Sequence, residues 1–360
     1  MFDLKAHLKS LVEAHAPSGH EAPIREIIRA AWQPLCDEMQ GDRLGSLIGI
    51  KNGQPAAGSP RRKIMLAAHM DEIGLMVRDI VDGFIYVHRV SGIDNRVMLA
   101  QPVLVHGKRP LPGVVASVPP HLLTADMRSK YPTLEELIVD VGLPAADVNA
   151  LVQIGDLITP DVPMIDLLGK RVAAKAFDNR ALVAAVTACL NHLQNLKHQW
   201  DVYAVATVQE ETGLRGAAVA AHQIQPDVAV ALDVTFAPQP GVNGDVTNEM
   251  GGGPGIGVGP NFHPKLFDKI KEVAQANEIK TQNDIIPGAS GTDAWMIQVA
   301  LEGIPTALLE VPLRNMHSPV ETIDLRDVER VGRLLALFIA SLDSDFLQAI
   351  EYKTNQKAQS

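Results

Sequence analysis

The chain has 360 residues, of which 46% are hydrophobic and 21% are charged. This composition excludes a disordered chain, and the length predicts two domains. The net charge of −10 argues against nucleic acid or an anionic membrane surface as a partner, because both favour a basic protein face.

The N-terminal segment predicts two helices followed by two strands. Leu4, Leu8, Leu11 and Val12 recur at helical spacing within residues 2–15, and a second helical stretch spans residues 21–32 after a Pro-Ser-Gly turn. Strands are predicted over 44–51 and 63–68, with a Gly/Pro/Ser loop between them. The second strand reads KIMLAAH, an apolar run that ends in a histidine. This pattern is typical of a buried strand that delivers a polar side chain at its carboxyl end.

Residues 73–165 differ in character from the segments on either side. Short β-type runs alternate there with Gly and Pro turns, and a helix is predicted only around 133–139. From residue 170 onward an α/β rhythm returns, and the Gly-rich run 251–259 is interpreted as a loop. Helices are predicted over 179–193, 264–276 and 325–342, and strands over 201–208, 227–234 and 304–311. The simplest account is one α/β domain, 1–72 plus 166–360, interrupted by a small β domain, 73–165, that is closed or sandwich-like.

The cysteine content and the start of the chain predict a cytoplasmic protein. Cys36 and Cys189 are the two cysteines, and the first helix lacks the basic start and apolar core of a signal peptide. No apolar run approaches the roughly 20 residues that span a bilayer.

Five residues with metal-ligand side chains lie at strand ends or in tight connections: His69, Asp178, Glu211, Asp233 and His317. Two imidazoles and three carboxylates can hold two divalent cations if one carboxylate bridges them. Zinc accepts this mixture of nitrogen and oxygen donors, and so do cobalt and manganese. Two further acids, Asp71 and Glu210, are then free to take part in the chemistry.

Each of these residues has a simpler interpretation when it is taken alone. Asp178 can cap the helix that follows it, and the adjacent Glu210 and Glu211 can be solvated turn residues. The two histidines can be ordinary core or loop residues. The joint occurrence of all of them favours the metal site, because the simpler interpretation requires several independent coincidences.

The motifs in which these residues stand resemble those of the cytosolic di-metal aminopeptidases that form tetrahedral dodecamers. That family includes glutamyl, leucyl, lysyl and deblocking enzymes and proteins once labelled endoglucanase M. The motifs, in chain order, are AAHMDEIG, KAFDNR, VQEETGLRG, ALDV, GTDA and MHSPVE. The resemblance implies a zinc-exopeptidase-like α/β/α sandwich, an inserted barrel-like β domain that joins subunits into dimers, and a homo-oligomer of twelve.

The resemblance also implies a role for each candidate residue. His69 and Asp233 would hold one metal, Glu211 and His317 the second, and Asp178 would bridge the two. Glu210 would be the general base, and Asp71 would orient the His69 imidazole. Thr292 and Asp293 are expected either to line the cleft or to cap a helix. The implied reaction is removal of N-terminal residues from short peptides by an activated water molecule.

Other functions stay open at this point. An N-acyl amino acid deacylase on the same scaffold is the closest rival, and a carboxypeptidase is a further one. An endoglucanase is less well supported, because glycosidases use a carboxylate pair without this metal set. A non-enzymatic scaffold has the least support, since all seven residues are present.

Overall fold

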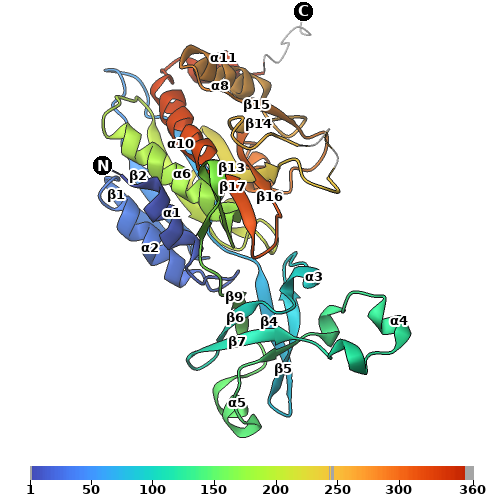
Figure 1. Ribbon diagram of the computed structural model, residues 1–360. Helices are drawn as coiled ribbons and strands as arrows, with labels where there is room; N and C mark the ends of the chain where they lie inside the picture. Colours follow the sequence, from blue (N-terminus) through green and yellow to red (C-terminus); the bar gives the residue numbers. More distant parts are fainter. Residues whose placement is uncertain (1, 243, 245–246, 353–360) are drawn as a thin grey trace, which may run out of the picture.

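The computed structural model describes residues 2–242, 244 and 247–352 of the protein. Positions 243, 245–246 and 353–360, all within the predicted segment 166–360, lie outside the described residues. The described chain has two parts, an α/β body and a small β-barrel that projects from one end of it (Figure 1).

The α/β body is built on one mixed sheet of eleven strands. Its strands are β1 (Glu38–Gly41), β2 (Leu47–Lys51), β3 (Lys63–His69), β10 (Ile165–Asp166), β11 (Arg171–Ala174), β12 (Asp201–Thr207), β13 (Val228–Phe236), β14 (Gly255–Val258), β15 (Gln282–Ile285), β16 (Thr306–Arg314) and β17 (Glu321–Asp324). The main path runs β1-β2-β12-β3-β13-β16-β17-β11-β10, and β14 joins β16 to β15. Four central strands, β12, β3, β13 and β16, are mutually parallel, so their carboxyl ends meet at one edge.

Helices cover both faces of this sheet (Figure 1). The helices of the body are α1 (Leu4–Val12), α2 (Ala22–Trp32), α6 (Phe177–Leu193), α7 (Arg215–Ile224), α8 (Pro264–Ala276), α9 (Asp293–Gln298), α10 (Leu325–Ala340) and α11 (Phe346–Ile350). Along β3, Ile64 and Leu66 face the core shared with α1, α2, α6, α8 and α10, whereas Met65 and Ala67 face α7 and α9. This alternation is the period-2 pattern of a strand buried on both sides. The predicted α/β/α sandwich is confirmed.

The barrel is a closed sheet of six strands with its own apolar core. Its strands are β4 (Gly74–Val81), β5 (Phe84–Val90), β6 (Pro102–His106), β7 (Pro110–Ala116), β8 (Ile138–Asp140) and β9 (Leu157–Pro160). They follow the order β4-β5-β8-β7-β6-β9, and every neighbouring pair is antiparallel. Closure leaves no strand edge unpaired. The prediction of a barrel-like β domain is therefore confirmed, while its boundaries at 73 and 165 stay a prediction.

Three local predictions are wrong. Residues 133–139 form one 3₁₀ turn, Leu134–Glu136, which the Thr133 and Glu136 capping box begins, and then strand β8, because Val139 is needed in the barrel core. Helices α3 (Asn95–Met98), α4 (Ala125–Arg128) and α5 (Ala145–Leu151), and a 3₁₀ turn at Pro120–Leu122, were not expected. The Gly-rich run contains β14, where a Cβ at Gly257 would stand 3.0 Å from Leu308.

The described residues contain no helix that combines the length and the apolar character needed to cross a membrane. Cys36 and Cys189 are both free thiols.

Candidate metal centre and active site

The structure brings all seven predicted site residues to the carboxyl edge of the central parallel strands. His69 is the last residue of β3, Glu210 and Glu211 follow β12, and His317 follows β16. Asp233 does not end its strand as expected, since β13 continues to Phe236. The convergence follows from the topology, because parallel neighbours present their carboxyl ends side by side.

Asp178 lies between the two imidazoles. One carboxylate oxygen, Oδ1, is 3.1 Å from Nε2 of His69, and the other, Oδ2, is 3.4 Å from Nε2 of His317. The Asp178 carboxylate faces the two imidazoles and not the backbone N–H groups of α6, so Asp178 does not act as the helix cap that its sequence position allowed. Asp178 and Asn179 instead have non-helical backbone angles, and the peptide bond between them is cis.

Two triads of possible metal ligands share Asp178. In the first, donor atoms of His69, Asp178 and Asp233 all lie within 4.8 Å of one another, and in the second the same holds for Asp178, Glu211 and His317. A third triad, His69, Glu210 and Glu211, overlaps both. The first two triads have the arrangement expected for two cations and one bridging carboxylate. The ligand assignment itself stays a prediction.

The electrostatics of this cluster favour bound cations. Burial, with the charges of neighbouring carboxylates, raises the pKa of Glu210 to about 10 and that of Glu211 to about 7, and raises the pKa of Asp233 well above its usual range. So many carboxylates cannot ionise together in a desolvated site unless positive charge compensates them. Two divalent cations supply that compensation, and the mixed nitrogen and oxygen donors suit zinc, cobalt or manganese. The residues present therefore fit a two-cation site.

Without cations, the two imidazoles supply part of the positive charge that compensates the carboxylates. Burial lowers the pKa of His69 and His317, but the surrounding carboxylates outweigh it and raise the pKa of His317 to about 9 and that of His69 well above its usual range. The pKa of Asp178 is correspondingly lowered, since hydrogen bonds from both imidazoles overcome the effect of its burial. Cations and protons thus compete for the same side chains.

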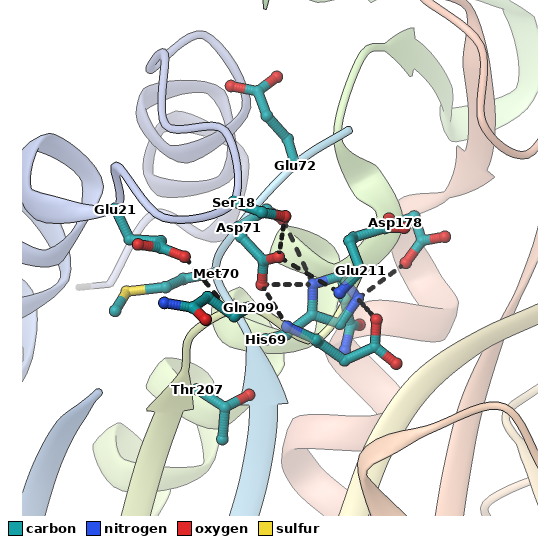
Figure 2. Close-up of polar contacts among 12 residues, drawn as sticks. Ser18, Glu21, His69, Met70, Asp71, Glu72, Asp178, Thr207, Gln209 and Glu211 are labelled. Atoms are coloured by element: carbon teal, nitrogen blue, oxygen red, sulfur yellow. Dashed lines mark hydrogen bonds and ion pairs between the residues drawn. The ribbon is translucent and has the colours of Figure 1, made fainter. Parts of the chain in front are cut away.

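Asp71 links His69 to the turn that carries the paired glutamates (Figure 2). Its Oδ1 lies 3.5 Å from Nδ1 of His69. The same carboxylate accepts hydrogen bonds from Ser18 Oγ at 2.5 Å and from the backbone N–H groups of Glu210 at 3.2 Å and Glu211 at 3.3 Å. One fully buried carboxylate therefore lies against an imidazole and fixes the backbone of two neighbouring acids, an arrangement by which outer residues can tune a metal site.

The adjacent residue Glu72 points away from His69 (Figure 2) and belongs to a buried ion cluster behind the site. It pairs with Lys175 Nζ at 2.7 Å and with Arg180 at 3.2 Å. The guanidinium of Arg180 also donates to the carbonyl oxygen of Met70, between His69 and Asp71. This cluster holds the end of β3 against the start of α6.

Glu321 is a site residue that sequence reasoning missed. Its Oε1 accepts from the backbone N–H of His317 at 2.9 Å, and its Oε2 accepts from that of Asp178 at 3.0 Å. The side chain is 2% exposed. Glu321 thus clamps the backbone of two candidate ligands that are far apart in the sequence. The available signal was an acid four residues after His317 in MHSPVE.

The barrel also reaches the site, through the loop that follows β5. Ser91 Oγ donates to Glu211 Oε2 at 2.7 Å, and the carbonyl oxygen of Gly92 lies 3.3 Å from His317 Nδ1. These contacts fix the orientation of one candidate ligand and the tautomer of another. No local pattern in the sequence predicts these two contacts.

Replacing Gly92 by alanine is expected to displace the His317 imidazole, because a Cβ there would stand 2.5 Å from Nδ1. The expected result is a roughly 10- to 100-fold loss of cation affinity, measured by competition with a chromogenic chelator. Gly288→Ala is the matched control, since an added Cβ there meets nothing within 4 Å. Wild-type cation affinity in the Gly92→Ala variant would show that close packing of Gly92 against His317 is not needed for cation binding.

A cavity of about 740 Å³ opens above the candidate ligands. Its wall contains six acidic residues, Asp178, Glu210, Glu211, Asp233, Asp284 and Glu310. Within the described part of the chain, its lining includes no lysine or arginine. Thr292 lines it as expected, but Asp293 does not: it is buried and accepts a hydrogen bond from Thr207 Oγ1 at 2.6 Å.

The comparisons with known proteins agree on one family. The model of the M42 glutamyl aminopeptidase family matches residues 45–334. The lysyl aminopeptidase of Pyrococcus furiosus is 37% identical over 342 residues, which cover 93% of this chain and 96% of that protein.

Solved structures agree as well. A TET aminopeptidase from a marine sediment archaeon of the Thaumarchaeota superposes with a TM-score of 0.90 at 32% identity, over 97% of this chain and 99% of that one. A TET1 peptidase from Pyrococcus horikoshii, described as assembling into a tetrahedron or a large octahedral shell, superposes with a TM-score of 0.83 at 30% identity. It is matched over 94% of this chain and 100% of its own.

Proposed function

The chain belongs to the M42 glutamyl aminopeptidase family, and from this premise we propose that it removes N-terminal residues from short peptides with the help of two divalent cations. The aminopeptidase class follows from the family. The cation dependence rests on one observation, the Asp178 carboxylate that faces His69 with one oxygen and His317 with the other.

In this proposal, His69 and Asp233 hold one cation, Glu211 and His317 hold the other, and Asp178 bridges them. Zinc or cobalt suits the donors best, and manganese is a further candidate. When bound, such cations supply an activated water and a Lewis acid for the scissile carbonyl.

The paired glutamates divide two tasks between them. Glu211 is held by Ser91 and lies 3.7 Å from His317 Nε2, whereas Glu210 lies 3.7 Å from His69 Nε2. We assign the general base to Glu210, which is not among the five proposed ligands: its carboxylate takes a proton from the attacking water, and the resulting carboxylic acid donates that proton to the leaving amine. Asp71 keeps His69 oriented through both steps.

The barrel is the proposed dimerisation domain, spanning residues 73–165. The Pyrococcus horikoshii relative can assemble into a tetrahedron or a large octahedral shell. The segment 73–165 of this chain exposes large apolar side chains: Leu99, Val114, Val118, Leu122, Met127 and Tyr131. Exposed apolar groups of this kind mark interaction surfaces. We expect dimers that build a homo-dodecamer in the cytoplasm, and light scattering coupled to size exclusion tests the subunit number.

Hydrolysis of aminoacyl-p-nitroanilides tests the activity. The protein is stripped of metal, resupplied with zinc, cobalt or manganese, and assayed beside N-acetylated controls. We expect cation-dependent release of p-nitroaniline from the free-amine substrates alone. Turnover of the acylated compounds alone, with release of the acyl group, would make the protein a deacylase instead.

A further inference from the structure

A second acidic group lies in the cavity beside the candidate metal centre. Glu310 on β16 stands directly opposite Asp233 on the parallel strand β13, so the two side chains project to the same side of the sheet. Asp284 on β15 lies next to Glu310 and accepts a hydrogen bond from Thr235 Oγ1 at 2.5 Å. Both acids line the cavity.

Glu310 has an unused hydrogen-bonding atom. Its side chain is 3% exposed, and its Oε2 has no hydrogen-bond partner among the residues that the structure describes. Burial raises the pKa of Glu310 well above its usual range, and the neighbouring Asp284 carboxyl, which is hydrogen-bonded to it, raises the pKa further. The Glu310 carboxyl therefore keeps one oxygen, Oε2, that no described residue binds. A buried polar atom without a protein partner calls for another one, such as water, an ion or a ligand group.

Apolar side chains share the cavity with this acid pair. Ile285, Ile286 and Trp295 line the same cavity. An aliphatic chain that ends in a cation matches such a site, since its methylene groups pack on the walls and its charge meets the carboxylates. An acidic side chain would be repelled by Asp284 and Glu310, and the described lining offers no lysine or arginine to pair with it.

We propose that Glu310 and Asp284 form the subsite for the side chain of the substrate's N-terminal residue, and that they select lysine or arginine there. The proposal rests on the aminopeptidase function proposed above and specifies its substrate class. The register of β13 and β16 places this subsite one strand from Asp233, so a peptide whose first carbonyl lies at the metal centre has its first side chain beside Glu310.

The test compares lysyl- and norleucyl-p-nitroanilide, which differ in the charge at the end of the chain. The cation-loaded wild type should prefer the lysyl substrate in kcat/KM by about tenfold or more. Glu310→Gln should remove most of this preference, while its kcat/KM for the norleucyl substrate stays within about threefold of wild type. Metal content should stay unchanged. Glu302→Gln, an exposed carboxylate outside the cavity lining, is the control for overall charge.

Three outcomes would overturn the proposal. In the first, the wild type shows no preference for the lysyl substrate. In the second, the Glu310→Gln variant has lost its metal. The third is an equal loss on both substrates, which would assign Glu310 to the α-amine that all substrates share. If Glu310→Gln does not fold, Asp284→Asn serves in its place.

A binding measurement, which needs no turnover, tests the lysine subsite separately from the proposed aminopeptidase activity. Calorimetry of lysinamide and norleucinamide with the cation-loaded protein should give about tenfold tighter binding of lysinamide. If norleucyl substrates are hydrolysed but lysinamide binds no better than norleucinamide, the subsite is wrong and the aminopeptidase stands. If lysinamide is preferred but no substrate is cleaved, the subsite stands and the enzymatic proposal fails.

Discussion

Glu210→Gln is expected to lower kcat by about 10²–10⁴-fold, the usual contribution of a positioned general base. Glutamine keeps the size of the side chain but cannot take the proton of the attacking water. Because Glu210 is not one of the five proposed ligands, the variant should still bind metal at the wild-type level. Steady-state kinetics with the preferred p-nitroanilide, together with metal analysis by mass spectrometry, tests both statements.

The neighbouring Glu211→Gln is the matched control. It removes the same charge one residue away, but from a side chain that lies 3.7 Å from His317 Nε2 and shares a triad with Asp178 and His317. We expect this variant to lose cation affinity, and excess metal should restore part of its activity. The assignment of roles would be reversed if Glu210→Gln lost metal while Glu211→Gln retained metal and lost only kcat.

Removal of divalent cations is expected to abolish hydrolysis and to lower the melting temperature, with a larger drop at pH 9 than at pH 5. In the cation-free protein the pKa of Glu211 rises from 4.5 to about 7 and that of His317 from 6.5 to about 9. The folded state then binds more protons than the unfolded state between about pH 4.5 and 9, so its stability falls as the pH rises through this window.

Cations reverse this trend because they bind the deprotonated ligands. The stabilisation they provide should therefore grow from pH 5 to pH 9, and at a free concentration of about 1,000 Kd it amounts to about 4 kcal/mol. Differential scanning calorimetry with zinc and with chelator, at pH 5, 7 and 9, measures it. Asp178→Ala is the control and should respond little to zinc at any pH. A cation effect that shrinks as the pH rises would contradict the proposed ligand set.

Much of the site could be predicted because its residues follow strands. A histidine after KIMLAA and paired glutamates after a hydrophobic strand are local patterns, and parallel strands bring such ends together at one edge of a sheet. The order of helices and strands in the α/β body was also predictable, because apolar periodicity is a short-range property of the chain.

The barrel was harder to predict in detail. Its short strands carry weak periodicity, and the segment around Val139 became a strand because closure of the barrel requires one there. Long-range pairing of this kind overrides local helix preference. The small helices α3, α4 and α5 were missed because each is too short to show a clear apolar periodicity.

Local sequence patterns indicate which side chains can bind metal, which elements carry them and in what order these elements follow one another. Other contacts become visible only in the folded chain: Ser91 and Gly92 of the barrel contact the site, Glu321 accepts hydrogen bonds from the backbone of Asp178 and His317, and Glu310 meets Asp284 beside Asp233. Each of these contacts joins residues far apart along the chain or on different strands. They depend on strand register and on how the barrel docks, and these properties arise only from the packing of the whole chain.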